Sequence, residues 1–138
     1  MLSCLTDFAE EFQIPAIRLP SEELALALRL DRRSAASKAL WAWIFGRLRS
    51  HGERCLRRAG VSFADRVYGL LATGSITEKY LLGLIPQIRA DVVEIYSHPS
   101  PASPELEALL SPSVRSAIQA AGFVLSTHAD GGRVRGCV

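Results

Sequence analysis

One histidine stands where a proton-transfer group would be useful. His98 ends the segment VVEIYSHP (residues 92–99), whose β-branched and apolar residues predict a buried strand that Pro99 then stops. Because free imidazole titrates near neutral pH, His98 could donate or accept a proton in a reaction. The alternative is structural, with the ring capping the strand by hydrogen bonding the following loop. His98 alone therefore identifies no reaction.

Two further polar positions are expected at the same edge of the predicted sheet. Arg18 comes near the end of the apolar run IPAIRLP, and the segment from Asp65 to Gly69 lies within VSFADRVYGLL. Ligands of parallel α/β sheets collect at the carboxyl ends of the strands, which is where these residues should emerge. Arg18 would either hold a ligand there or pair with a nearby carboxylate.

Helical and strand-like segments alternate along the chain. Apolar residues at helical spacing predict the helices, and short runs rich in β-branched residues predict the strands. The expected order is a helix over residues 2–12, a strand over 14–20, a helix over 34–59, a strand within 61–71, a helix over 77–88 that Pro86 bends or ends, a strand over 91–98, two helices within 103–122 and a strand over 123–128. This alternation predicts an α/β fold with a mostly parallel sheet of about four strands.

Capping residues mark the ends of the predicted helices. Ser34, Thr77 and Ser111 stand where a side-chain oxygen can cap a helix N-terminus, and Gly60 and Gly122 follow the ends of two helices. Within the long helix over residues 34–59, one apolar stripe is expected to face the core. Its members are Trp41, Ile44, Leu48, Cys55 and Leu56.

Composition fits a single cytoplasmic domain. The chain has 138 residues, 49% of them hydrophobic, and its net charge is +2. A chain of this length and hydrophobic content can form one buried core. Its start has no basic leader before an apolar run, and the longest apolar run, ALWAWIF, is too short to cross a bilayer. The cysteines at positions 4, 55 and 137 are widely spaced and match no metal-binding pattern, which favours a reducing compartment.

Several linked motifs resemble those of a known family. EFQIPAIRLP, DRVYGLLATGSITEKYLLGLIPQI, VVEIYSHP and ELEALLSPSVRSAIQAAGF follow one another at the spacing found in the C-terminal half of the YdjC-like carbohydrate deacetylases, closest to the branch associated with hopanoid biosynthesis. The resemblance covers residues 1–127 and implies a partial (β/α)-barrel-like fold. It also implies a metal-dependent hydrolase that removes the acetyl group from an N-acetylated sugar or glycolipid. The remaining residues, 128–138, are expected to form a loose polar tail.

The resemblance assigns roles to the polar residues described above. The arginine at the strand end in the family corresponds to Arg18, and the histidine of its HP motif corresponds to His98. His98 would protonate the leaving amine or bind the acetyl oxygen. The segment from Asp65 to Gly69 would help to shape the sugar pocket.

Two motifs of the family are absent from this sequence. Members carry an early pair of aspartates and then an HxHxHP motif, which hold the divalent cation, zinc or magnesium, that activates water. Neither motif occurs here, and the histidines at positions 51, 98 and 128 are not spaced as a ligand pair. We therefore expect the chain to bind no metal specifically and to be inactive alone. A partial barrel also exposes sheet edges, which predicts self-association or a companion N-terminal half.

Two non-enzymatic alternatives remain open. Nine of the sixteen basic residues lie between Arg29 and Arg58, so this helix could bind nucleic acid or an anionic membrane surface, with Trp41 and Trp43 as anchors. A solvated arginine-rich face is the simpler interpretation, and nucleic acid is not the expected partner. Alternatively, the chain retains a sugar-binding wall without the chemistry of a deacetylase.

Overall fold

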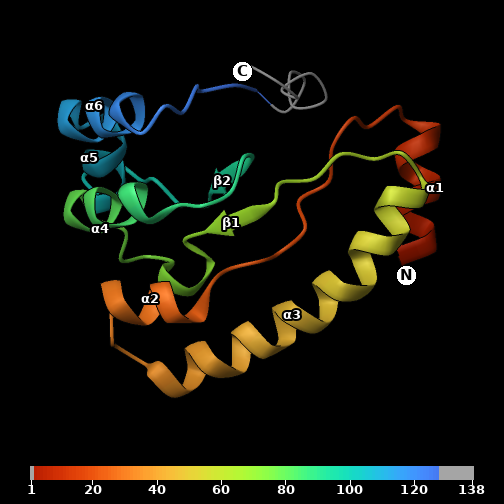
Figure 1. The fold of residues 1–138 in the computed structure, drawn as a ribbon, viewed down its shortest axis with the longest axis horizontal. Helices are drawn as coiled ribbons and strands as arrows, with labels where there is room; N and C mark the ends of the chain where they lie inside the picture. The colour runs from red at the N-terminus through yellow and green to blue at the C-terminus, as the bar shows by residue number, and fades with distance from the viewer. Residues whose placement is uncertain (1, 128–138) are drawn as a thin grey trace.

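The computed structural model describes residues 2–127 and shows a mixed α/β fold. Figure 1 shows α3 running diagonally beneath the strands, with α4, α5 and α6 gathered at one side and α1 at the other. The α-helices are α1 (Leu2–Glu11), α2 (Leu24–Leu30), α3 (Ala35–Arg58), α4 (Glu78–Leu84), α5 (Pro104–Leu110) and α6 (Pro112–Ala120), and the short 3₁₀ helices are η1 (Leu70–Ala72) and η2 (Ile85–Gln87).

The sheet is smaller than predicted. Strands β1 (Arg66–Tyr68) and β2 (Val93–Ile95) pair in parallel, with Val67 opposite Glu94. The strand expected over residues 14–20 is reduced to one bridge between Ala16 and Ser62. Residues 123–127 form no strand in the structure. A barrel is therefore not formed by residues 2–127, and the partial barrel stays a prediction.

Two of the three predicted helix caps are confirmed. The hydroxyl oxygens of Thr77 and Ser111 accept hydrogen bonds from the backbone N–H groups of Tyr80 and Val114. Ser34 does precede α3, but its backbone is left-handed with φ of 53° and its side chain makes no capping bond. Pro86 follows the end of α4 and lies within η2, as its missing N–H and fixed φ require.

The predicted core stripe of α3 is wrong in part. Leu56 is buried, but Trp41 is 51% exposed and Leu48 is 49% exposed. The side of α3 that faces the fold is instead marked by buried Lys38, whose Nζ lies 2.7 Å from Asp31 Oδ2, and by Gly52. Nothing in the apolar periodicity distinguishes this side from the other, because both carry large apolar residues.

Helix α2 was not expected and fills part of the core. Its sequence LALALRL alternates in hydropathy, and the residue before it gives no side-chain cap. Leu26 and Ala27 of α2 are nevertheless buried, and Leu26 belongs to the larger apolar cluster with residues of η1, α4, α5 and α6. Tertiary packing thus stabilises a helix that local signals do not mark.

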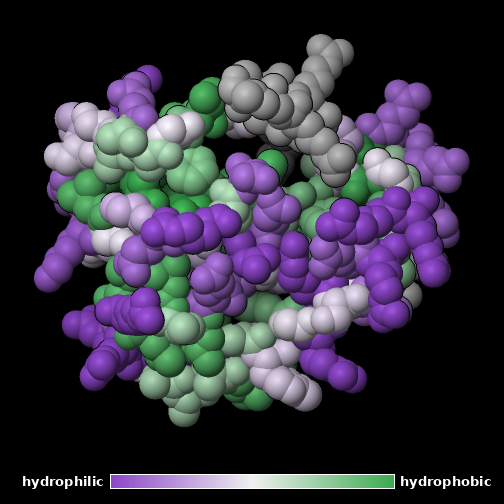
Figure 2. All heavy atoms as spheres, viewed as in Figure 1, coloured by the Kyte–Doolittle hydropathy of each residue, from purple (hydrophilic) through white to green (hydrophobic). Residues whose placement is uncertain are grey.

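The core of the described residues consists of two apolar clusters. The larger cluster includes Tyr68, Ile76 and Leu84, and the smaller one joins Ala9 of α1 to Leu19 and Leu56. Hydrophilic and hydrophobic patches alternate over the face in Figure 2. No helix among residues 2–127 has both the length and the apolar character needed to cross a membrane. The predicted cytoplasmic location stays a prediction.

Candidate functional site at the carboxyl ends of the strands

Arg18 and His98 both contact one aromatic ring. The Arg18 guanidinium carbon lies 5.0 Å from the centroid of the Tyr96 ring. The His98 ring meets the same tyrosine edge to face, with 4.7 Å between centroids and an interplanar angle of 88°. Tyr96 was not singled out from the sequence. The available signal was its position two residues before His98, since alternate residues of an extended segment share a face.

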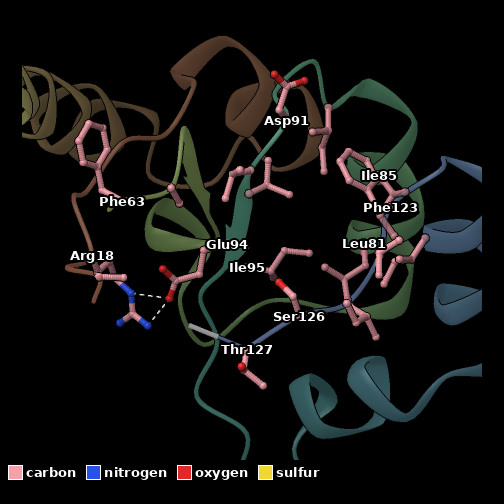
Figure 3. Close-up of a pocket in the computed structure, with 18 of the residues that line it drawn as sticks. Arg18, Phe63, Leu81, Ile85, Asp91, Glu94, Ile95, Phe123, Ser126 and Thr127 are labelled. Atoms are coloured by element: carbon pink, nitrogen blue, oxygen red, sulfur yellow. Dashed lines mark hydrogen bonds and ion pairs between the residues drawn. The ribbon is translucent and has the colours of Figure 1, made fainter. Parts of the chain in front are cut away.

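Arg18 also forms an ion pair with Glu94 of β2. Its Nε lies 2.5 Å from Glu94 Oε1, and Arg18 Nη2 contacts the same oxygen (Figure 3). This hydrogen bond raises the pKa of the Arg18 guanidinium further above its ordinary value, so the charge is fixed. The carboxylate partner that the sequence left open for Arg18 is therefore Glu94. The pair does not prevent ligand binding, because 43% of the Arg18 side chain remains exposed.

Glu94 has one oxygen that lacks a partner. Its side chain is only 14% exposed, and Oε2 is buried without a hydrogen bond among the described residues. A buried carboxylate oxygen normally accepts a hydrogen bond, because leaving it unpaired is costly. A ligand hydroxyl or amide N–H would reach this buried oxygen only after a neighbouring side chain moved.

A cavity of about 580 Å³ opens beside this ion pair. Figure 3 shows Ile95, Leu81, Ile85 and Phe123 facing its interior, with the Arg18–Glu94 pair at one border and Ser126 and Thr127 nearby. A ligand would meet apolar walls over most of its surface and polar groups at one border. Such a combination is typical of small-molecule sites.

Asp65 and Gly69 are separated by the length of β1. Asp65 precedes the strand, where its N–H donates to Val92 O at 2.8 Å and its Oδ2 accepts from Val92 N at 3.0 Å. Gly69 follows the strand and lies at the same end as Tyr96 and His98. The structure thus brings Gly69, but not Asp65, to the carboxyl ends where Arg18 meets Tyr96.

Gly69 permits a close approach of the two strand ends. Its φ is +92°, and a Cβ there would stand 2.8 Å from Ile76 Cδ1 and closer still to the Tyr96 carbonyl oxygen. The Tyr96 N–H donates to Tyr68 O at 2.7 Å, which holds this approach in place. Only glycine combines the left-handed backbone with the absent side chain that this position requires.

Two carboxylates shape the loops around the site through backbone hydrogen bonds. Glu22 accepts from Gly69 N at 3.2 Å and from Leu71 N at 2.7 Å. Glu105, only 2% exposed, accepts from the N–H groups of His98 at 2.6 Å, Gly74 at 2.7 Å and Ile76 at 3.4 Å. Neither glutamate was predicted, because no pattern in the sequence marks a carboxylate whose partners are main-chain groups distant along the chain.

Changing Glu22 to glutamine should alter the pH dependence of stability. Burial raises the pKa of the Glu22 carboxyl above its ordinary value, although the N–H groups of Leu71 and Gly69 lower it. A raised pKa in the folded state adds stability that is full below the unfolded-state pKa, about 4.3, and is lost as pH rises through the folded-state pKa. Between pH 7 and pH 4 the unfolding free energy of the wild type should therefore rise relative to that of Glu22→Gln.

Urea unfolding at pH 7, 6, 5 and 4 would measure this difference. Groups common to both proteins cancel when the two curves are subtracted, which isolates Glu22. Glu107→Gln removes one exposed carboxylate from α5 and serves as the control. A difference between wild type and Glu22→Gln that stays constant with pH would contradict the assignment.

The described residues do not fit a divalent metal. No three side chains of His, Cys, Asp or Glu among residues 2–127 come together as a metal site. His51 is exposed on α3, and His128 lies outside the described residues. Arg18, Glu94 and His98 therefore act without a metal held by residues 2–127.

Comparison with known proteins identifies a family. The family model described as YdjC-like protein matches residues 1–120. No curated protein and no solved structure matches the chain significantly.

Proposed function

The chain belongs to the YdjC-like family, and from this membership we propose that it carries the substrate-holding wall of an N-acetyl-sugar deacetylase. The hopanoid-associated branch is the one whose motifs it most resembles, so the proposed substrate is the N-acetylated sugar of a glycolipid. The observation that carries the proposal is the row of Arg18, Tyr96 and His98 beside the unpaired oxygen of Glu94.

The side chains of this row suit the polar groups of an amide and a sugar. The exposed part of Arg18 would donate to the acetyl oxygen or to a ring hydroxyl, and Glu94 Oε2 would accept from a hydroxyl or the amide N–H. His98 would deliver a proton to the nitrogen that leaves as the amine when the carbon–nitrogen bond breaks. Tyr96 would orient Arg18 and His98 by contacting their side chains.

The hydrolytic water would be activated by groups that residues 2–127 do not supply. In the resemblance that supports this proposal, an aspartate pair and an HxHxHP motif hold the zinc or magnesium ion, and both motifs are absent from the printed sequence. We therefore propose that this chain is the C-terminal part of a longer or two-part enzyme. Alone it would bind substrate without hydrolysing it.

The purified chain should bind an N-acetylglucosamine glycoside but release no acetate with added zinc or magnesium. Saturation-transfer NMR would measure binding, and an acetate assay would measure turnover. Arg18→Gln should weaken binding about tenfold or more, because a hydrogen bond to a charged group contributes about 1.5–3 kcal/mol. Arg89→Gln, an exposed arginine that bonds only to nearby backbone oxygens, is the matched control.

Two outcomes would contradict the proposal. Equal binding by wild type and Arg18→Gln would show that the row of Arg18, Tyr96 and His98 does not hold the substrate. Acetate release by the chain alone would show that it is catalytically complete. A polypeptide that carries the aspartate pair and the HxHxHP motif should restore acetate release when added, and His98→Gln should then slow it about a hundredfold or more.

A further inference from the structure

The outward face of α3 begins with a large apolar patch. The side chains exposed there are Leu40 (58%), Trp41 (51%), Trp43 (66%) and Leu48 (49%), and the Trp41 ring lies 5.8 Å from that of Phe45. We refer to the four exposed residues Leu40, Trp41, Trp43 and Leu48 as the tryptophan patch. Soluble surfaces rarely gather so many large apolar side chains on one helix without a binding role.

The same face continues as a row of basic residues. Arg47, His51, Arg54 and Arg58 recur at intervals of four, three and four, so they share one side of α3 with Leu40 and Trp43 of the patch, and all four are exposed. Arg54 bonds to a backbone oxygen, and the nearest carboxylate of the helix, Glu53, is paired with Arg49 and Arg57. The positive charge of this row is therefore available to a partner.

Positive charge also precedes the patch. Arg32 and Arg33, directly before α3, are both exposed, and Asp31 beside them is engaged by Lys38. In the view of Figure 2, pale and green spheres lie over the lower end of α3 and purple spheres over its upper end. The patch is thus flanked by arginines at both ends.

We propose that this face of α3 docks on the surface of an anionic lipid bilayer. Tryptophan rings favour the boundary between headgroups and acyl chains, because each combines a large apolar ring with one N–H donor. Arginines on either side would contact lipid phosphates, and the charges of α3 and of an anionic surface are complementary. The 24-residue helix, about 36 Å long at 1.5 Å per residue, would lie flat instead of crossing the membrane.

Other partners fit the face less well. A nucleic acid would use the arginines but would leave most of the apolar side chains of the tryptophan patch in water. A second copy of the chain would cover the patch but would bring the arginine rows of two copies together, which is unfavourable. An anionic bilayer satisfies both parts of the surface.

Intrinsic fluorescence tests the proposal directly, because the chain has two tryptophans and both belong to the patch. Titration with vesicles of 70% phosphatidylcholine and 30% phosphatidylglycerol should shift the emission to shorter wavelength, and brominated lipids should quench it. Pure phosphatidylcholine vesicles should bind at least tenfold more weakly. Raising sodium chloride from 0.1 M to 0.5 M should weaken binding at least tenfold, since screening shortens the reach of the arginines.

Two combined variants test the basic row and the tryptophan patch separately. Arg47→Gln combined with Arg54→Gln and Arg58→Gln should remove the preference for anionic vesicles, while Leu40→Ser combined with Leu48→Ser should abolish the blue shift. Leu110→Ser and Lys79→Gln change an exposed leucine and an exposed cation elsewhere and should leave binding unchanged. Circular dichroism confirms that each variant folds.

Three results would overturn the proposal. The first is the absence of a vesicle-dependent shift in the wild type. The second is a blue shift that depends on protein concentration without vesicles, which would mean that a second copy covers the patch. The third is salt-sensitive binding of duplex DNA by a chain that ignores vesicles. None of these results depends on deacetylase activity, so the proposal stands or falls independently of the function proposed above.

Discussion

Replacing Glu105 by alanine is expected to lower the unfolding free energy by about 3 kcal/mol or more. The carboxylate is 2% exposed and accepts from the backbone N–H groups of His98, Gly74 and Ile76. A buried donor left without a partner costs about 1–3 kcal/mol, which applies fully to the Ile76 N–H and in part to the half-buried N–H groups of His98 and Gly74. Three are lost together, so the loop after β2 and the loop before α4 should both loosen. Glu105→Gln keeps one acceptor oxygen and should cost less.

Glu107→Ala is the matched control for Glu105→Ala. Glu107 lies on the exposed side of α5, so its removal should change the unfolding free energy by less than about 0.5 kcal/mol. Urea unfolding followed by far-ultraviolet circular dichroism would measure both. Equal stabilities of the two variants would show that Glu105 does not hold the loops as described.

Replacing Gly69 by alanine is expected to destabilise the chain by about 3 kcal/mol. The left-handed backbone alone costs a residue with a Cβ about 1–2 kcal/mol. At Gly69 the added carbon would also press against the Tyr96 carbonyl oxygen and Ile76 Cδ1, so β2 would have to move away from β1 or the loop would have to refold. His98, two residues beyond Tyr96, would move with it.

Gly60→Ala separates these two contributions. Gly60 has φ of +69°, and a Cβ added there would meet nothing within 4 Å, so alanine at this position costs only the backbone conformation. Thermal unfolding of both variants gives the difference between them. A loss at Gly69 no larger than the loss at Gly60 would refute the close approach as the reason for glycine.

Local signals in the sequence located the helices better than the strands. The oxygens of Thr77 and Ser111 act within three residues, so they could be read directly from the sequence. A strand needs a neighbour, and residues 14–20 have only the bridge between Ala16 and Ser62 in the described part of the chain. Strand propensity cannot show whether that neighbour exists.

The site was predicted only in part, because the sequence shows local signals but not contacts between distant segments. Arg18 and His98 could be placed because each comes at the end of an apolar run, and a carboxylate partner for Arg18 was one of two expectations. Glu22 and Glu105 could not be found, because their partners are backbone groups far away along the chain. The exposure of Trp41 was likewise hidden, since helical periodicity identifies an apolar side but not the element that covers it.

The hydrogen bonds from backbone N–H groups to Glu22 and Glu105 limit which substitutions the site loops tolerate. Every amino acid except proline carries the N–H group that these carboxylates bind. The hydrogen bonds themselves therefore require no particular side chain at positions 71, 74, 76 and 98. Other features constrain two of these positions, because the Ile76 side chain is buried in the core and Gly74 has φ of +80°. In a saturation library, proline should be depleted at all four positions.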